Sequence, residues 1–418
     1  MIDFTQLLKS EIRPALGVTE VGAIALAAAR AYGVVGGMVL HIEMKMNGGM
    51  YKNGFSCVIP GTNELGCEMA AALGAIGGQW ELGLECLKGI HEEHIQKAKA
   101  IPVEILIAKE KETIYIQAEV TTTRGVGIVR IADTHDNIVY VAKDDEVIFQ
   151  KQQEKDEKKE SVDFDSMSVS DMVEYASLVS VEELSFVKDM IAMNCHLSEE
   201  GEKGTGLAIG ATLDAFRKKG VLGNDMIYQA QRLTCCAMDA RLSGLPYPAM
   251  SIVGSGSHGI LCSLPVVSYG RSIQAAEEEI LRAVALSGLV TIFSKHYTGR
   301  LSALCGCVLG GGSGAAAGLV YLMGGGAAQA SHAMNHMAAN LTGMICDGGS
   351  IGCSLKASAG VYSAFLSAML AMNGTAVPEL FGVIGSSAEQ TAKNLGKISE
   401  EGMSPMDATI IDIMQGKK

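Results

Sequence analysis

The chain has 418 residues, of which 33 are Lys or Arg and 46 are Asp or Glu, so its net charge is −13. An acidic chain lacks the positive surface that binds nucleic acid and the basic clusters that hold proteins to anionic membranes. The length allows two or three domains, or one large core with insertions. Composition therefore favours an enzyme of small molecules and excludes nucleic-acid and membrane partners.

The first residues and the cysteine usage both indicate a reducing compartment. The opening MIDFTQLLKSEIRPALG has charges spread through it and no apolar signal core, which argues against secretion. Eleven cysteines in such a chain are typical of reduced thiols or metal ligands, not of disulfides. We therefore expect a cytoplasmic protein.

Residues 1–100 predict helices separated by a Gly-rich loop. Residues 18–33 and 66–90 form Ala-rich helical runs that contain or close on glycine. The segment between them, MNGGMYKNGFSCVIPGTNELG, carries turn residues and is typical of a loop that serves a site. Its polar candidates for substrate binding are Lys52, Asn53 and Thr62.

The remaining segments predict a small sheet followed by helices. Residues 101–150 alternate and are rich in β-branched residues, which predicts an antiparallel sheet of about four strands. Residues 151–164 form a charged linker. From 165 to 418 the pattern is helical, with Ser-x-x-Asp and Ser-x-x-Glu capping signals. We predict an α+β protein, in which 1–100 and 165–418 form a mainly helical catalytic body and 101–150 a small β-rich insertion.

A stretch without Lys, Arg, Asp or Glu runs between Arg300 and Asp347. Residues 301–344 are long enough to span a membrane, but their content is small and polar, unlike the Leu/Ile-rich runs that hydrocarbon favours. We therefore expect a close-packed interior and no membrane span.

Three cysteines lie in or beside this neutral stretch: Cys305, Cys346 and Cys353. Thiolates in an apolar setting are what an iron–sulfur cluster requires. Three ligands instead of four would leave one iron open to act as a Lewis acid on a substrate. The alternative is that they are small buried core residues, and Cys307 competes with Cys305 for a ligand role.

The loop GSGSHG (254–259) is suited to gripping a carboxylate with backbone N–H groups. His258 could donate or accept a proton, although a tight turn with a hydrogen-bonded histidine is the alternative. Arg241 could capture a carboxylate or form an ion pair with Asp239. The loop supplies three candidate substrate-binding residues, Ser255, Gly256 and Ser257.

Asp347 and Lys356 interrupt the neutral sequence near the third cysteine. Charges in such a setting are usually paired or functional, so both join His258 as candidate catalytic residues. His332 and His336 have helical spacing that would suit zinc, but no carboxylate or thiol is in register, which favours a polar helix face.

Several motifs resemble those of the iron–sulfur-dependent L-serine dehydratase α-domain superfamily. They are GSGSHGILCSLPV, GRLSALCGC, GLVYLMGGG and GMICDGGSIGCSLK. Within it, the single-chain L-cysteine desulfidase family is the most similar branch, because RPALGVTE, KNGFSCVIPGTNELG and THDNIVYV resemble its N-terminal half. The resemblance covers nearly the whole chain.

The resemblance implies a 4Fe–4S cluster held by Cys305, Cys346 and Cys353, with the fourth iron free for substrate. Cys305 is preferred over Cys307 because the family places its cysteine directly before the glycine of ALCG. The implied reaction is β-elimination from a small amino acid without pyridoxal phosphate, in an oxygen-sensitive enzyme. L-cysteine would give pyruvate, ammonia and sulfide, and L-serine would give pyruvate and ammonia.

Two positions depart from the desulfidase pattern. Val18 stands where the family's GCTEP motif has a cysteine, and Ser257 replaces the asparagine of GSGN. Cys57 and Cys67 are the candidates to substitute in space for the missing cysteine. These changes keep two alternatives open: a lyase for serine or another β-substituted or hydroxy acid, and a non-catalytic cluster-bearing sensor or scaffold. We also expect a homodimer, although no sequence pattern carries that expectation.

Overall fold

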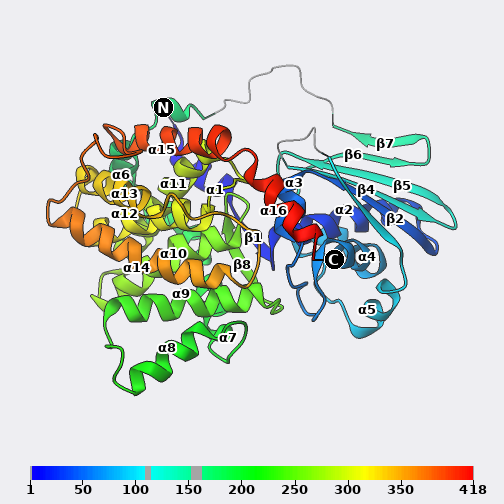
Figure 1. Cartoon of the computed structure of the whole chain (residues 1–418), viewed down its shortest axis with the longest axis horizontal. Helices are drawn as coiled ribbons and strands as arrows, with labels where there is room; N and C mark the ends of the chain where they lie inside the picture. Colours follow the sequence, from blue (N-terminus) through cyan, green and yellow to red (C-terminus); the bar gives the residue numbers. More distant parts are fainter. Residues whose placement is uncertain (1, 109–113, 152–161, 418) are drawn as a thin grey trace.

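The structure is a computed structural model that describes residues 2–108, 114–151 and 162–417. A helical body lies beside an α/β unit built on a six-stranded sheet (Figure 1). This arrangement confirms the predicted α+β class with a mainly helical body.

The α-helices in the described residues are α1 (Phe4–Glu11), α2 (Thr19–Val35), α3 (Gly48–Gly54), α4 (Gly66–Gly77), α5 (Glu92–Ala98), α6 (Val169–Leu178), α7 (Ser185–Gly201), α8 (Ile209–Lys218), α9 (Met226–Leu242), α10 (Gly256–Ser272), α11 (Glu277–Thr298), α12 (Gly312–Leu322), α13 (Ala327–Leu341), α14 (Cys353–Met372), α15 (Ala388–Lys397) and α16 (Met406–Gln415). The strands are β1 (Ile12–Leu16), β2 (Val39–Met46), β3 (Val103–Ile107), β4 (Tyr115–Thr122), β5 (Gly125–Ala132), β6 (Ile138–Lys143), β7 (Glu146–Gln150) and β8 (Pro248–Ile252).

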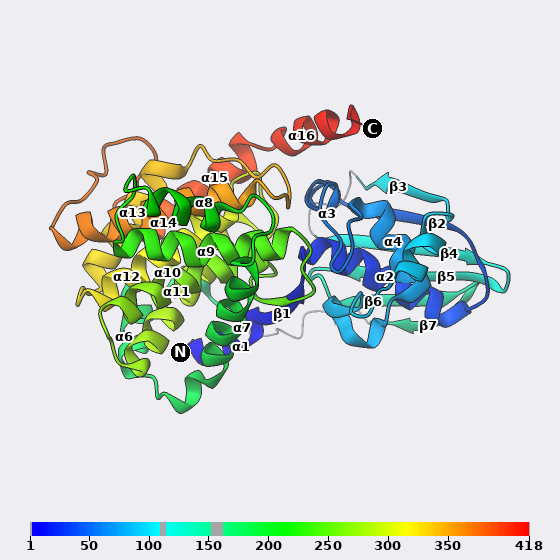
Figure 2. The same ribbon diagram turned by 90° about the horizontal axis from the view of Figure 1, so that it is seen from below.

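The six-stranded sheet has the order β3-β2-β4-β5-β6-β7. Alternate residues of β4 are buried, which is the pattern of a strand with one covered face. Helix α2 provides that cover together with α4, which packs beside it (Figure 2). Gly127 of β5 meets the backbone of α2 closely, because a Cβ added there would lie 2.0 Å from the Ala31 carbonyl oxygen.

The sequence predicted that residues 1–100 belong to the helical body, but much of this segment lies in the α/β unit. Strand β2 lies inside the sheet between β3 and β4, and α2 and α4 pack on that sheet and not within the helical body. The β2–β3 pair is parallel, whereas the other neighbouring pairs of this sheet are antiparallel. An apolar helical run can be buried by a sheet or by other helices, so its periodicity alone does not choose between them. The predicted charged linker falls mostly on residues 152–161, which lie outside the described residues.

Small residues allow the helices of the body to approach one another closely. Helices α9, α10, α11, α12 and α14 form its centre. Gly314 of α12 shows the fit, since a Cβ added there would lie 2.3 Å from the Ser287 carbonyl oxygen of α11. Among the described residues, α14 is the one helix long and apolar enough to cross a membrane, and half of its apolar window is buried inside the protein. Its packing against α9, α12 and α13 is that of a core helix.

Two segments connect the body to the α/β unit. Strand β1 pairs with β8 of the body just before α2 begins. At the other end of the chain, α16 extends from the body onto α3 (Figure 1). Lys52 of α3 forms an ion pair with Asp407 of α16 at 2.7 Å and donates a hydrogen bond to the Ser302 carbonyl oxygen at 3.3 Å. The C-terminal helix α16 and α3 thus meet beside one loop of the body.

Candidate active site between the two units

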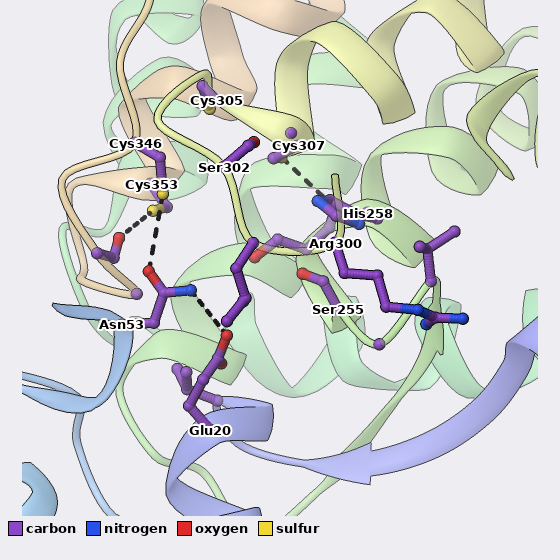
Figure 3. A pocket seen from close by; sticks show the side chains of 18 of the residues that line it. Glu20, Asn53, Ser255, His258, Arg300, Ser302, Cys305, Cys307, Cys346 and Cys353 are labelled. Carbon is purple, nitrogen blue, oxygen red and sulfur yellow. Dashed lines mark hydrogen bonds between the residues drawn. The ribbon is translucent and has the colours of Figure 1, made fainter. Parts of the chain in front are cut away.

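A pocket lies where the body meets the α/β unit (Figure 3). Its walls come from the start of α2, from α3 and the β5–β6 turn, and from four segments of the body around residues 241, 255, 300 and 350. The predicted site residues that line it are Asn53, Arg241, Ser255, Ser257, His258, Cys305, Cys346, Cys353 and Lys356. The fold thus gathers most of the predicted site residues from segments that lie far apart in the sequence.

Backbone pairing between two loops brings Cys305 and Cys346 together. The Cys305 N–H donates to the Met344 carbonyl oxygen at 2.9 Å, and the Cys346 N–H donates to the Ala303 carbonyl oxygen at 2.7 Å. Burial raises the pKa of the Cys305 thiol to about 12, with the neighbouring Cys346 adding to the effect. Both loops are held in register by main-chain bonds, so the thiols are placed before any ligand binds.

Cys353 completes the thiol set from the first position of α14. Its Sγ donates to the Gly348 carbonyl oxygen at 3.4 Å, and its place at a helix N-terminus favours the thiolate. Burial nevertheless raises the pKa of this thiol, as does the nearby Cys346. Lys356, one turn further on, donates to the Ile345 carbonyl oxygen at 3.0 Å and forms an ion pair with Asp347. This cation stands close to the thiols that a metal would deprotonate.

The arrangement of the three cysteines fits a metal cluster better than a single metal ion. Among the described residues, no three His, Cys, Asp or Glu side chains are close enough together to hold one metal ion. A cluster takes one thiolate on each of several irons, so its ligands stand apart around it. Cys305, Cys346 and Cys353 on the walls of one pocket fit that requirement. Cys307 also lines the pocket, and its thiol donates to the Ser257 carbonyl oxygen at 3.5 Å.

Arg241 lies buried against the start of α10. Its Nη1 donates to Ser257 Oγ at 2.9 Å, and its Nε has no hydrogen-bond partner. Gly256 does not line the pocket but permits this approach, because a Cβ there would lie 2.4 Å from Nε. Asp239 does not pair with Arg241 and instead accepts a hydrogen bond from the Ile209 N–H at 2.9 Å. The guanidinium therefore retains donors for an anion in the pocket.

His258 stands near two buried cations. Burial lowers its pKa to about 3, and the charges of Lys295 and Arg241 act in the same direction, so the imidazole is neutral. Lys295 is 2% exposed and donates to Ser302 Oγ at 3.3 Å. Burial also lowers the pKa of this amine, to about 8. A Cβ on Gly306 would lie 2.6 Å from Lys295 Nζ and 2.7 Å from His258 Nε2, so both side chains converge on this glycine.

Glu20 and His135 reach the pocket from the α/β unit, and the sequence analysis did not select either of them. Asn53 Nδ2 donates to Glu20 Oε1 at 2.8 Å, and His135 Nε2 lies 3.7 Å from the same oxygen. Burial would raise the pKa of Glu20, but His135 and Asn53 lower it to about 2. Figure 3 shows Asn53 between Glu20 and the cysteine sulfurs, where its Oδ1 accepts from Cys346 Sγ at 3.8 Å. The sequence offered a partial signal for both residues, since Glu20 ends the RPALGVTE motif and His135 lies in the THDNIVYV motif.

Besides Gly256, three predicted residues lie outside the pocket lining. Lys52 is 1% exposed and joins Asp407 to the Ser302 loop, which makes it a structural residue. Thr62 shapes a turn, because its Oγ1 donates to the Ile59 carbonyl oxygen at 2.9 Å. Asp347 is half exposed and pairs with Lys356, which does line the pocket.

Val18 is buried in the pocket wall, where the desulfidase motif has a thiol. Cys57 lies close to it, because a Cβ on Gly349 would contact Val18 Cγ1 at 2.8 Å and Cys57 Sγ at 3.0 Å. The Cys57 thiol does not line the pocket and donates to the Asn53 carbonyl oxygen at 2.6 Å. Cys67 is further away, with its Sγ directed to the Tyr51 carbonyl oxygen at 3.8 Å. Of the two, Cys57 is the one beside Val18.

The protein is thus an α+β chain with a thiol-lined pocket between a helical body and a sheet unit. Residues 81–412 match the family described as serine dehydratase alpha chain, and the chain belongs to this family. It is 41% identical to a UPF0597 protein of Clostridium botulinum over 417 residues, which cover 98% of this chain and 97% of that protein. UPF0597 proteins of Clostridioides difficile and Caldanaerobacter subterraneus are 38% and 37% identical, over 98% and 100% of this chain and 98% and 99% of theirs.

Proposed function

We propose that the protein is an iron–sulfur lyase that catalyses β-elimination from a small amino acid and converts L-cysteine to pyruvate, ammonia and sulfide. The observation that carries the proposal is the convergence of Cys305, Cys346 and Cys353 on one pocket in a member of the serine dehydratase alpha chain family. L-serine, giving pyruvate and ammonia, is the second substrate to consider because the family description names it. Either reaction would be a step of amino-acid catabolism.

The three thiols would hold the cluster, and Lys295 and Lys356 supply positive charge for the thiolates. When bound, the cluster supplies a Lewis-acidic iron that stabilises the departing β-substituent. A site with three thiolates and an open iron also implies sensitivity to oxygen, and we expect handling in air to inactivate the protein.

The chain's own residues would bind the substrate and move its proton. Arg241 has free donors beside Ser257 and would hold the carboxylate. His258 is neutral, so it can accept the α-proton. A substrate carboxylate bound to Arg241 would offset the positive charge of Arg241 and so raise the pKa of His258. Lys356 is the second candidate for proton transfer. The enamine product then hydrolyses in water to pyruvate and ammonia.

The proposal is tested by pyruvate release from anaerobically prepared, cluster-loaded protein. L-cysteine and L-serine are assayed side by side, with sulfide measured as well, and Cys353→Ala is the matched variant. We expect pyruvate with sulfide from L-cysteine and at least about a 100-fold loss in Cys353→Ala, since a ligand to the reacting metal is removed. Pyruvate chiefly from L-serine would identify a dehydratase. A colourless preparation without iron and sulfide would contradict the cluster itself.

Val18 favours one alternative of another class, a non-catalytic sensor or scaffold that kept the cluster. The pocket wall there is apolar, so no thiol is available at this position to act as a base or sulfur relay. An intact cluster with no product from either amino acid would support this alternative. A homodimer remains our expectation for the assembly, and light scattering of the loaded protein tests it.

A further inference from the structure

The charges on the pocket walls are not balanced within the protein. The lining cations are Arg241, Lys295, Arg300 and Lys356, and Glu20 is the one carboxylate among the described lining residues. Arg300 pairs with Glu11, and Lys356 pairs with Asp347, both carboxylates outside the lining. Buried charges are costly unless they are paired.

Two cations, Arg241 and Lys295, and the carboxylate of Glu20 are thus available to bind a charged ligand. Arg241 and Lys295 are 3% and 2% exposed, and among the described residues neither has a carboxylate partner. They suit anions, namely a carboxylate and the thiolates of a metal site. Glu20 has the opposite charge and lines the same pocket from α2 of the α/β unit.

The side chains that hold Glu20 contact one of its two carboxylate oxygens. Asn53 and His135 both approach Oε1, at 2.8 and 3.7 Å, and Oε2 has no side-chain partner among the described residues. His135 is 4% exposed and its Nε2 has no hydrogen-bond partner. A buried carboxylate that is held mainly through one oxygen can accept a further hydrogen bond from a donor in the pocket.

We propose that Glu20, positioned by Asn53 and His135, binds the α-ammonium group of the substrate and selects amino acids over the matching 2-hydroxy acids. This inference rests on the proposed function, because it places an α-amino acid in the same pocket. An ammonium group carries three donors and a positive charge, both of which Glu20 complements. A hydroxyl in its place offers one donor and no charge. Asn53 also contacts Cys346, which places this subsite next to a predicted cluster ligand.

The test uses L-alanine and L-lactate, which differ at Cα in the ammonium and hydroxyl groups and have no β-substituent to eliminate. Their dissociation constants are measured by calorimetry on anaerobic, cluster-loaded protein. We expect the unmodified protein to bind L-alanine more tightly than L-lactate. Glu20→Gln is isosteric and keeps an acceptor for Asn53. It should raise the dissociation constant of L-alanine by about 10- to 100-fold and change that of L-lactate by less than about twofold.

Two further variants control the measurement. Glu20→Asp keeps the charge on a shorter side chain and should retain a preference for L-alanine. Glu104→Gln changes an exposed residue of β3 and should leave both dissociation constants unchanged. A Glu20→Gln protein that still prefers L-alanine overturns the proposal, and so does an unmodified protein that binds both ligands equally or neither.

The binding measurement distinguishes failure of the ammonium subsite from failure of the proposed reaction. If no pyruvate forms from L-cysteine or L-serine but the Glu20-dependent preference for L-alanine is observed, the ammonium subsite stands and the reaction fails. If pyruvate forms but Glu20→Gln leaves the preference intact, the reaction stands and the subsite fails.

Discussion

Gly306 lies against the ends of two pocket side chains, and the absence of a Cβ lets both reach the pocket. The Lys295 amine and the His258 ring stand 2.6 and 2.7 Å from the place a Cβ would occupy. The backbone of Gly306 is helical, with φ at −61°, so a side chain would meet no backbone strain. The glycine is therefore required by the two functional groups and not by the turn.

Gly306→Ala should impair the reaction far more than the fold. The added methyl group displaces the ends of Lys295 and His258, and overpacking of this kind costs about 1–3 kcal/mol of unfolding free energy. Misplacement of the reacting groups should lower kcat/KM by about 100-fold. The measurement pairs urea unfolding with pyruvate assays, and Gly343→Ala is the control because its Cβ would meet nothing within 4 Å. An unchanged kcat/KM in Gly306→Ala would contradict this role.

Helix α16 acts at the scale of elements, because it reaches from the body to α3 beside the pocket loops. Asp407 contributes a carboxylate to buried Lys52, which in turn holds the Ser302 carbonyl oxygen. The α16 side chain Met414 also lies near Gly348, since a Cβ there would contact its Cε at 3.3 Å. The C-terminal helix thus supports the loops that carry Cys305 and Cys346.

Asp407→Asn should destabilise the protein and loosen these loops. The substitution leaves the Lys52 charge buried without its partner, which lowers the free energy of unfolding. Because the Asp407 side chain is 31% exposed, the expected loss is only about 2 kcal/mol. Urea unfolding measures this loss, and hydrogen exchange should become faster in residues 300–307 and 346–349. Glu93→Gln, in the exposed pair with Lys97, is the matched control and should change neither. Equal exchange in Asp407→Asn and the unmodified protein would contradict the support by α16.

The whole molecule places its pocket between two units, and the Glu20–Asn53–His135 contacts lie at that boundary. The pKa of Glu20 is lowered from 4.5 to about 2, mainly by His135 and Asn53 acting against burial. The unfolded chain therefore binds more protons than the folded one between these two values. This contribution to stability is complete above pH 4.5 and is lost as the pH falls toward 2.

Glu20→Gln should make stability less dependent on acid. Between pH 6 and pH 3, the unmodified metal-free protein should lose about 2 kcal/mol of unfolding free energy through Glu20 alone. The variant has no titrating group at this position, so its loss should be smaller by that amount. Urea unfolding at both pH values measures the difference, with Glu104→Gln as the control. Identical losses in the variant and the unmodified protein would show that Glu20 is not held as an anion in the fold.

The sequence by itself determined the α+β class and part of the pocket lining. Helical and alternating periods are local, and the cysteine, GSGSHG and Lys356 motifs are short enough to be recognised without a fold. Nine of the predicted site residues do line one pocket.

Only the tertiary structure decided the rest, because the deciding contacts join distant parts of the chain. Lys52 looked like a binding residue until Asp407, from the last helix, proved to be its partner. Glu20 ends the RPALGVTE motif without standing out in it, and Lys295 lies in no motif, so both become site residues only where α2 and α11 reach the same pocket. The same holds for α2 itself, whose apolar run is covered by the sheet because β2 pairs with strands more than 50 residues later, between β3 and β4. Local patterns record period and turn propensity, whereas burial and charge pairing depend on which surfaces meet.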